Sequence, residues 1–139
     1  MSLAVLASSA AAACSSSTSD LDHAQCLGRQ YDALKPSLEQ TWQDTLSAAK
    51  AADKYQAEQR SHLSRDLLDA SDSPIQYEKD LRTSQQAWIA YWHAECSSES
   101  NESKGRTDRR LIYPTCAIRL TGARVGQLKN YKLGLTEGN

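Results

Sequence analysis

The chain is poor in the side chains that usually build a protein core. It has no phenylalanine and one methionine among 139 residues, and hydrophobic residues make up 40% of it. A small domain with so little bulky apolar surface has a thin core. We therefore expect its three tryptophans and six tyrosines to supply much of the buried area.

Long apolar runs and an excess of charge of one sign are missing as well. No stretch of the sequence is long and apolar enough to span a bilayer. Sixteen basic and 17 acidic residues leave a net charge of −1, which creates no broad field to attract nucleic acid or an anionic membrane. The composition thus argues against a nucleic-acid partner and against a transmembrane segment.

Sequence motifs of the common catalytic classes are absent. The chain has no G-x-S-x-G, no H-E-x-x-H, no phosphate-binding loop and no dinucleotide fingerprint. Scattered carboxylates do not form an acid–base pair unless the fold brings them together. We predict a protein that is not an enzyme and that uses no cofactor.

Glycine is absent between Arg29 and Lys104, where only Pro36 and Pro74 interrupt the chain. This absence predicts an all-α fold, and we expect a small bundle of about four helices. A first helix is predicted by apolar residues at steps of three and four: Leu27, Tyr31, Leu34, Leu38, Trp42, Leu46 and Ala49.

The later helices are predicted from their end signals. A weakly amphipathic second helix is expected over Asp53 to Asp69. Ser73 as cap, Pro74 in the first turn and Gln76 in a capping box begin a third helix, which ends near Cys96. We expect a polar loop over Ser97 to Arg110 and a last helix from about Thr115.

Four cysteines, Cys14, Cys26, Cys96 and Cys116, stand near the two ends of the sequence. An even number in a small polar chain indicates two disulfides and an oxidising compartment, hence a periplasmic or secreted protein. Placed on the expected helices, all four gather at one pole of the bundle. Three pairings are open, and we favour Cys14–Cys96 with Cys26–Cys116.

A zinc site is the alternative role for these cysteines. His23 and His93 each stand three residues before a cysteine, which on a helix places them side by side. With reduced thiols they would complete a Cys₂His₂ set. Export and the even number of cysteines favour disulfides over this metal site.

The sequence divides into three parts. Residues 1–13 resemble a residual export signal, with Ala11-Ala12-Ala13 as an A-x-A cleavage site and vector-derived residues at the start. Residues 14–133 form the single domain, and residues 134–139 a frayed tail. A lipid anchor on Cys14 is the rival interpretation; it is disfavoured because Ala11 stands where a leucine is usual and because it would leave an odd number of thiols.

Two blocks of residues carry a resemblance to a known family. The first is Leu81, Arg82, Gln85, Trp88, Tyr91 and Cys96, and the second is Cys116, Leu120, Thr121, Arg124 and Leu128. Together with the early pair of cysteines they resemble the LprI-like family of small secreted bacterial proteins, named after a mycobacterial lysozyme inhibitor. The likeness covers most of Cys14 to Leu128, but Trp92-His93 replaces an Arg-Asp pair of the family pattern.

This resemblance implies an exported binding protein that inhibits lysozyme-type glycosidases. A protein partner, lysozyme, follows from it. The alternative is a cell-envelope module that binds a glycan or another protein and inhibits nothing, because family membership does not fix function.

Candidate binding residues lie around the later cysteines. Trp92 replaces an arginine of the family pattern, so we expect it to be the most exposed aromatic residue. The bland alternative is that the aromatic residues are packed in the core and that the basic run is a solvated loop. The predicted partner-binding residues are Trp92, His93, Glu95, Glu99, Lys104, Arg106, Arg109 and Arg110.

Overall fold

A computed structural model of the chain describes Cys14 and residues 19–63, 74–106 and 109–137. These residues form three helices: α2 over Asp20–Ser61, α3 over Tyr77–Glu102 and α4 over Arg109–Glu137. The predicted all-α class is confirmed. None of these helices is both long enough and apolar enough to cross a membrane.

The expected number of about four helices does not match the three described ones, because α2 is continuous where two helices were predicted. It passes through Pro36 and through the first part of the predicted second helix, and it ends at Ser61. Pro36 lacks one backbone donor, but its exposed position packs against no other helix and α2 continues through it. The later part of the predicted second helix and the predicted Ser73 cap lie outside the described residues.

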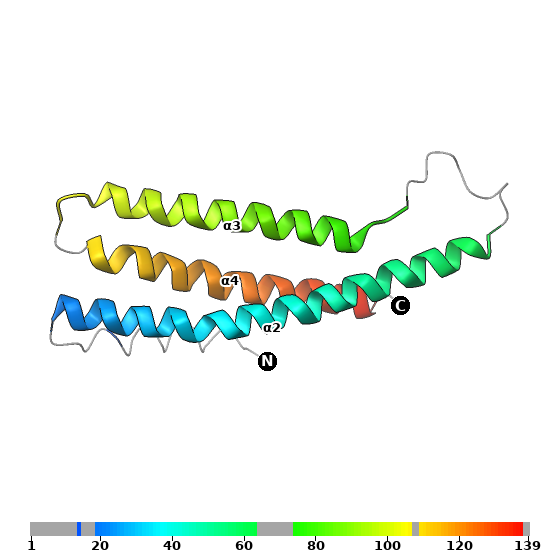
Figure 1. Cartoon of the computed structure of the whole chain (residues 1–139), viewed down its shortest axis with the longest axis horizontal. Helices are drawn as coiled ribbons and strands as arrows, with labels where there is room; N and C mark the ends of the chain where they lie inside the picture. Colours follow the sequence, from blue (N-terminus) through cyan, green and yellow to red (C-terminus); the bar gives the residue numbers. More distant parts are fainter. Residues whose placement is uncertain (1–13, 15–18, 64–73, 107–108, 138–139) are drawn as a thin grey trace.

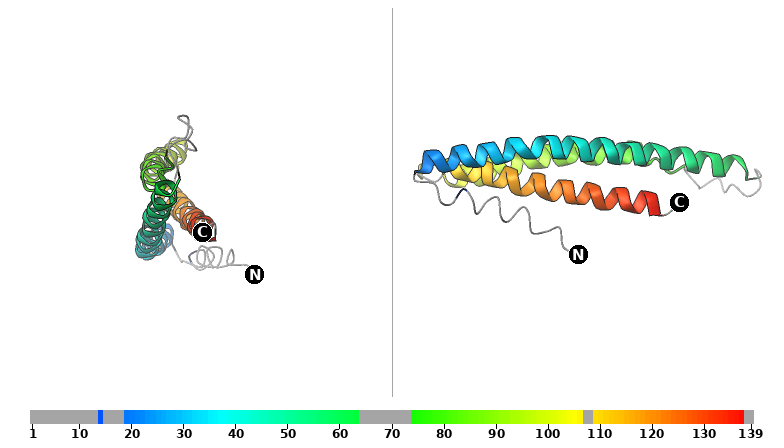
Figure 2. Two further views of the ribbon diagram at one scale, coloured as in Figure 1. Left: turned by 90° about the vertical axis from the view of Figure 1, so that its right-hand side faces the viewer. Right: turned by 90° about the horizontal axis from the view of Figure 1, so that it is seen from below.

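The three helices form an elongated up-down-up bundle (Figure 1). α2 is the longest; α3 returns alongside it, and α4 runs in the same direction as α2. The start of α2, the end of α3 and the start of α4 therefore lie at one end of the molecule. Seen along the bundle, the three helices occupy the corners of a triangle (Figure 2).

All four cysteines lie at this end, which we call the cysteine pole. Cys14 is bonded to Cys26, and Cys96 to Cys116. The two disulfides and the shared pole agree with the prediction, but the favoured pairing is wrong. Each cysteine is bonded to the next one along the chain, because Cys96 of α3 faces Cys116 of α4 across the connection between these helices. With all four sulfurs bonded, no thiolate remains for zinc, and a thioether-linked lipid on Cys14 would need the sulfur that holds Cys26.

The predicted polar loop over Ser97 to Arg110 is wrong at both of its ends. α3 continues to Glu102, and α4 begins at Arg109. Contacts with α4 favour the extra turns of α3: Glu99 forms an ion pair with Arg119, and Ser100 is buried. The connection between the helices is thereby shortened to residues 103–108.

The core is built from small and aliphatic side chains. In the main cluster, Leu46, Ala49 and Ala52 of α2 meet Leu81 of α3 and Leu128 of α4. At the cysteine pole the disulfides themselves fill the interior, with Leu27 and Ile118 beside Cys14, and Leu120 beside Cys96 and Cys116. None of the nine tryptophan and tyrosine side chains is fully buried, but five of them are half-buried and pack against the core clusters. That the aromatic residues supply much of the buried area stays a prediction.

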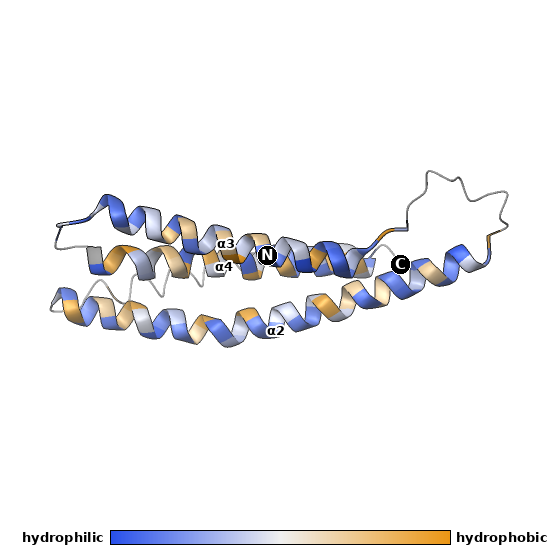
Figure 3. Cartoon of the chain, turned by 45° about the horizontal axis from the view of Figure 1, so that its top comes forward, coloured by the Kyte–Doolittle hydropathy of each residue, from blue (hydrophilic) through white to orange (hydrophobic). Residues whose placement is uncertain are grey.

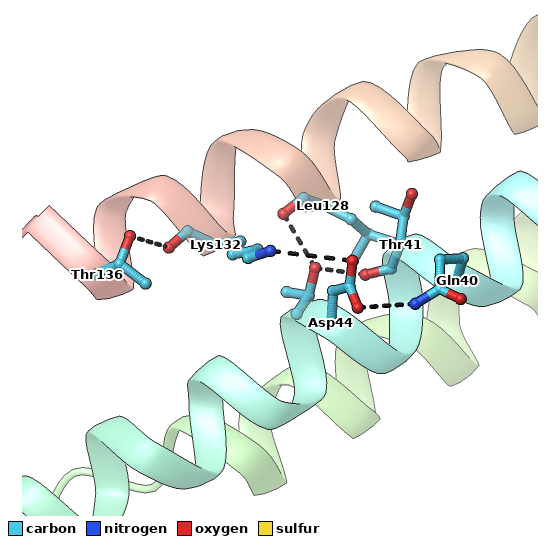
Figure 4. Close-up of polar contacts among 7 residues, drawn as sticks. Gln40, Thr41, Asp44, Leu128, Lys132 and Thr136 are labelled. Carbon is cyan, nitrogen blue, oxygen red and sulfur yellow. Dashed lines mark hydrogen bonds and ion pairs between the residues drawn. The ribbon is translucent and has the colours of Figure 1, made fainter.

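Small residues let the parallel helices α2 and α4 approach closely. Thr45 is fully buried, and its hydroxyl donates a hydrogen bond to the Thr41 carbonyl at 2.7 Å. The same hydroxyl lies 3.3 Å from the carbonyl oxygen of Leu128 on α4 (Figure 4). On the surface beside this contact, Asp44 of α2 faces Lys132 of α4 at 3.9 Å. A side chain larger than threonine at position 45 would push the two helices apart.

The start of α3 is capped by a residue of another helix. Gln76 occupies the cap position but makes no side-chain cap, and Pro74 lies outside the helix, so both predicted start signals are wrong. Instead, Asp53 of α2 accepts hydrogen bonds from the backbone N–H groups of Tyr77 at 2.7 Å and Glu78 at 3.0 Å. Its negative charge also complements the positive end of the helix dipole. Asp53 therefore joins the beginning of α3 to α2.

Replacing Asp53 tests this capping between helices. We expect Asp53→Ala to lower the free energy of unfolding by about 0.5–2 kcal/mol, because two backbone donors lose their acceptor. Urea unfolding followed by circular dichroism measures the change. Asp44→Ala is the matched control, since it removes an aspartate from the same helix that only contacts surface side chains, and we expect a loss of about 1 kcal/mol or less. Equal losses would contradict the capping role.

Peptide mapping tests the disulfide pairing. Trypsin cleaves after lysine and arginine, so both early cysteines stay in the one peptide that ends at Arg29. We expect that unreduced peptide to be two hydrogens lighter than its reduced form, and residues 83–104 to be linked to residues 111–119. Mass spectrometry of an unreduced digest decides the question. One species that joins all three peptides would show that the pairing is wrong.

Candidate functional site

An open groove of about 520 Å³ runs between α2 and α3. Its volume falls within the usual range for small-molecule sites, about 300–1,000 Å³. Thr121 of α4 forms part of its floor. The walls are Tyr31, Lys35, Leu38, Glu39 and Trp42 from α2, and Arg82, Gln85, Gln86, Trp88, Ile89 and Trp92 from α3.

Apolar and polar side chains are mixed along the helices that form this groove (Figure 3). Its lining combines aromatic rings with side-chain amides and charged groups. Glu39 is the single carboxylate among the lining residues, and none of them is a serine, a cysteine or a histidine. These aromatic, amide and charged groups are ones that can bind a ligand.

Trp92 stands at the centre of an aromatic cluster beside the groove. Tyr31 and Trp88 lie roughly parallel to its ring, with centroids at 5.9 and 6.3 Å. Tyr113 and His93 meet the ring edge-on, at 6.3 and 4.2 Å. Such offset and edge-on arrangements are the favourable ones for aromatic pairs. The indole N–H of Trp92 is buried, and no acceptor among the described residues bonds to it.

The prediction that Trp92 is the most exposed aromatic residue is wrong. Trp92 is half-buried by its neighbours, whereas Tyr91, the residue before it, is 51% exposed. Successive residues of a helix point about 100° apart, so the two side chains have different surroundings. Trp92 faces the groove, and Tyr91 is not among the residues that line it.

The α2 wall of the groove carries a cation beside a tyrosine. Lys35 lies 4.8 Å from the ring centroid of Tyr31, and it pairs with Asp32 at 2.8 Å. Burial raises the pKa of the Tyr31 phenol, although the nearby ammonium acts in the opposite direction. The hydrogen bond to Asp32 raises the pKa of Lys35. At neutral pH this wall thus presents a neutral phenol and a charged amine that already has a partner.

A buried arginine lies beneath the α3 wall. Arg124 of α4 is 8% exposed. It donates hydrogen bonds to Gln85 at 2.9 Å, Ser84 at 3.2 Å and Gln127 at 3.3 Å, and its guanidinium lies 5.8 Å from the centre of the Trp88 ring. Burial lowers the pKa of the guanidinium. Because all three acceptors are neutral, the hydrogen bonds and the aromatic ring stabilise the cation.

The structure brings part of the family motif together. Gln85, Trp88 and Arg124 form the contacts just described. Leu81 and Leu128 lie in the main core, Leu120 packs against the cysteines, and Thr121 lines the groove. Arg82 pairs with Glu78 at 3.0 Å on the surface, and Tyr91 stands apart from the other motif residues. The motif is thus mainly the framework behind the groove.

The α2 wall was not recognised as part of a site from the sequence. Tyr31, Leu38 and Trp42 belong to the predicted apolar stripe, which was assigned to the core. In the structure that stripe divides: Leu27, Leu46 and Ala49 are buried, whereas the three wall residues are half-buried. The sequence signal for this wall is that the charged residues Lys35 and Glu39 alternate with Tyr31, Leu38 and Trp42, which is unusual for a stripe that faces the core.

The other predicted binding residues lie near the end of the cysteine pole. His93 is exposed beside Trp92, Glu95 is half-buried, and Glu99 pairs with Arg119. We use the name tip for Glu102, Ser103, Lys104, Gly105, Arg106 and Arg110. Two of its three cations, Lys104 and Arg106, are exposed on either side of Gly105, whose positive φ of 91° makes the turn. Arg109 begins α4, and its side chain lies outside the described residues.

The comparisons with known proteins place these features in a family. A family model described as lysozyme inhibitor LprI matches residues 10–128, which is most of the chain. An uncharacterised protein of Rhizobium meliloti (strain 1021) is 25% identical over 116 residues, covering 84% of this chain and 76% of that protein. No solved structure matches the chain.

A double-mutant cycle tests the contact between Gln85 and Arg124. We expect Gln85→Ala and Arg124→Ala each to destabilise the fold by about 1–3 kcal/mol, because each leaves a buried polar group without a partner. The two effects should not add, and the coupling energy should be about 0.5–3 kcal/mol. Urea unfolding of the four proteins measures it. The exposed pair Glu78 and Arg82 is the control, with an expected coupling of about 0.5 kcal/mol or less. Fully additive effects at Gln85 and Arg124 would contradict the proposed contact.

Proposed function

Because the chain belongs to the lysozyme inhibitor LprI family, we propose that it is an exported binding protein that inhibits a lysozyme-type glycosidase. Two disulfides fit an oxidising compartment such as the bacterial periplasm or the exterior. The groove lining offers binding groups without a catalytic pair, which supports a role in binding. The predicted export signal at residues 1–13 lies outside the described residues.

The tip is the observation that carries this proposal. The Cys96–Cys116 disulfide joins α3 to α4 just behind the short connection between them. The Glu99–Arg119 ion pair joins the same helices beside this disulfide, with each residue three positions after the bonded cysteine of its helix. The end of the bundle at which all three helices meet is thereby cross-linked before it meets a partner (Figure 1). A cross-linked end loses less conformational entropy on binding than a free one, which suits an inhibitor that inserts into a cleft.

The charge of the tip suits the active site of a glycosidase. Most enzymes of this class use a pair of carboxylic side chains on either side of the bond that they cleave. Lys104 and Arg106 present two cations at a turn, and Arg109 and Arg110 follow after Thr107 and Asp108 in the sequence. In the proposed complex the exposed cations of the tip approach the catalytic carboxylates. Attraction between these charges would also speed association.

Charge reversal at the tip tests the proposal. We expect micromolar amounts of the purified protein to reduce the activity of at least one lysozyme type. The variant Lys104→Glu/Arg106→Glu should inhibit at least tenfold more weakly, a loss of about 1.4 kcal/mol or more. Cell-wall lysis assays with several lysozyme types measure both effects. Raising the salt concentration should weaken inhibition by the unaltered protein, because it screens exposed charges.

The matched control is Lys50→Glu/Lys54→Glu, which makes the same change of charge on exposed residues of α2 away from the cysteine pole. Its inhibition should equal that of the unaltered protein. If both double variants lose inhibition equally, the effect comes from net charge and the tip is not the contact. Absence of inhibition for every lysozyme type would overturn the inhibitor proposal and favour an envelope module that binds without inhibiting.

A further inference from the structure

The chain places its tryptophans on the groove, at the edge of the core. All three tryptophans of the sequence, Trp42, Trp88 and Trp92, line the groove together with Tyr31. They are the largest side chains of a protein that has few bulky ones, yet all four are half-buried. Full burial would stabilise such a thin core most. Their position therefore favours contact with something in the groove.

Polar groups are interspersed between these rings. Gln86 is exposed on the α3 wall, and its side-chain amide offers both donors and an acceptor. Glu39 supplies a carboxylate from the opposite wall. The Gln85 amide oxygen is held by Arg124 at 2.9 Å, so this amide has a fixed orientation. The groove thus combines flat apolar surfaces with hydrogen-bonding groups on both of its walls.

The net charge of the groove is small. Lys35 and Arg82 are its two cations, and each pairs with a neighbouring carboxylate, Asp32 or Glu78. A strongly charged ligand would therefore gain little from electrostatics here. A wholly apolar ligand would displace water from the exposed Gln86 amide and from Glu39, which keeps only its hydrogen bond from Gln43, and would not replace the lost hydrogen bonds.

From this lining we infer that the groove between α2 and α3 is a binding site for a short, uncharged oligosaccharide. A sugar ring has C–H faces that pack on aromatic rings, whose faces carry partial negative charge. Its hydroxyl groups both donate and accept, which matches the amides and the carboxylate of the walls. The groove is open, so that a chain of linked sugars can extend beyond it.

This site is separate from the tip, and it does not rest on inhibition of a glycosidase. The groove is lined by residues of Tyr31 to Trp42 and Arg82 to Trp92, together with Thr121, and none of these belongs to the tip. A protein that binds saccharide without inhibiting a lysozyme would support the groove and contradict only the tip proposal.

Tryptophan fluorescence tests the saccharide site directly. Because all three tryptophans line the groove, their emission reports its occupancy without background from tryptophans elsewhere in the chain. We expect a β-1,4-linked tetramer of N-acetylglucosamine to change the emission in a saturable way and to protect the indoles from a soluble quencher. The absence of both effects at millimolar saccharide would overturn the proposal.

Two groove variants and one control make the test specific. Trp42→Ala removes an aromatic surface from the α2 wall. Gln86→Ala/Ile89→Ala removes two exposed side chains from the α3 wall. Because these two side chains are exposed, the second variant remains informative if the first unfolds. Calorimetric titration with the same tetramer should show at least tenfold weaker binding for each folded variant. Tyr91→Ala, which removes an exposed aromatic residue outside the groove, should bind normally. Equal affinities for all proteins, or a loss confined to Tyr91→Ala, would overturn the assignment.

Discussion

The two disulfides at the cysteine pole are the constraint on which the rest of the structure depends. Cys14, Cys96 and Cys116 are among the largest fully buried side chains of the described residues. Sulfur therefore takes the place of the bulky apolar groups that this chain lacks. Closing a loop by a disulfide stabilises a fold by about 2–4 kcal/mol, a large share of the total stability of a small domain. The Cys96–Cys116 bond also places α3 against α4 at the end that carries the tip.

The shortage of large core residues also explains the contact between α2 and α4. Thr45, Ala49 and Ala52 let the parallel helices lie close together, and Leu128 fills the space opposite them. α3 is held by the main core, by the Asp53 cap at its start, and by the hydrogen bonds from Arg124 to Ser84 and Gln85. Between α2 and α3 the packing opens into the groove, and there the tryptophans lie. Of the three contacts between helices, the one between α2 and α3 is thus the one that leaves an open groove beside the core.

Helical class, the position of the cysteines and the family were all predictable from the sequence. The long stretch without glycine and the apolar spacing of three and four residues are local signals, and local signals predict helices well. The errors came where distant contacts decide. α2 continues through Pro36 and past Asp53 as far as Ser61, and the supposed loop after Cys96 continues α3 because Glu99 and Ser100 meet α4. The favoured disulfide pairing failed for the same reason, since it depends on which side chains face each other.

Composition, spacing and motif are enough to predict a small helical protein of the LprI family with four cysteines at one pole, because these properties belong to single segments of chain. The groove and the Asp53 cap could not be predicted in this way. Tyr31, Leu38 and Trp42 line the groove at the edge of the core, and Asp53 caps a helix that begins 24 residues later. Burial and hydrogen-bond partners are properties of pairs of helices. A stripe on one helix shows which residues are apolar, but the position of its neighbours decides whether they are covered.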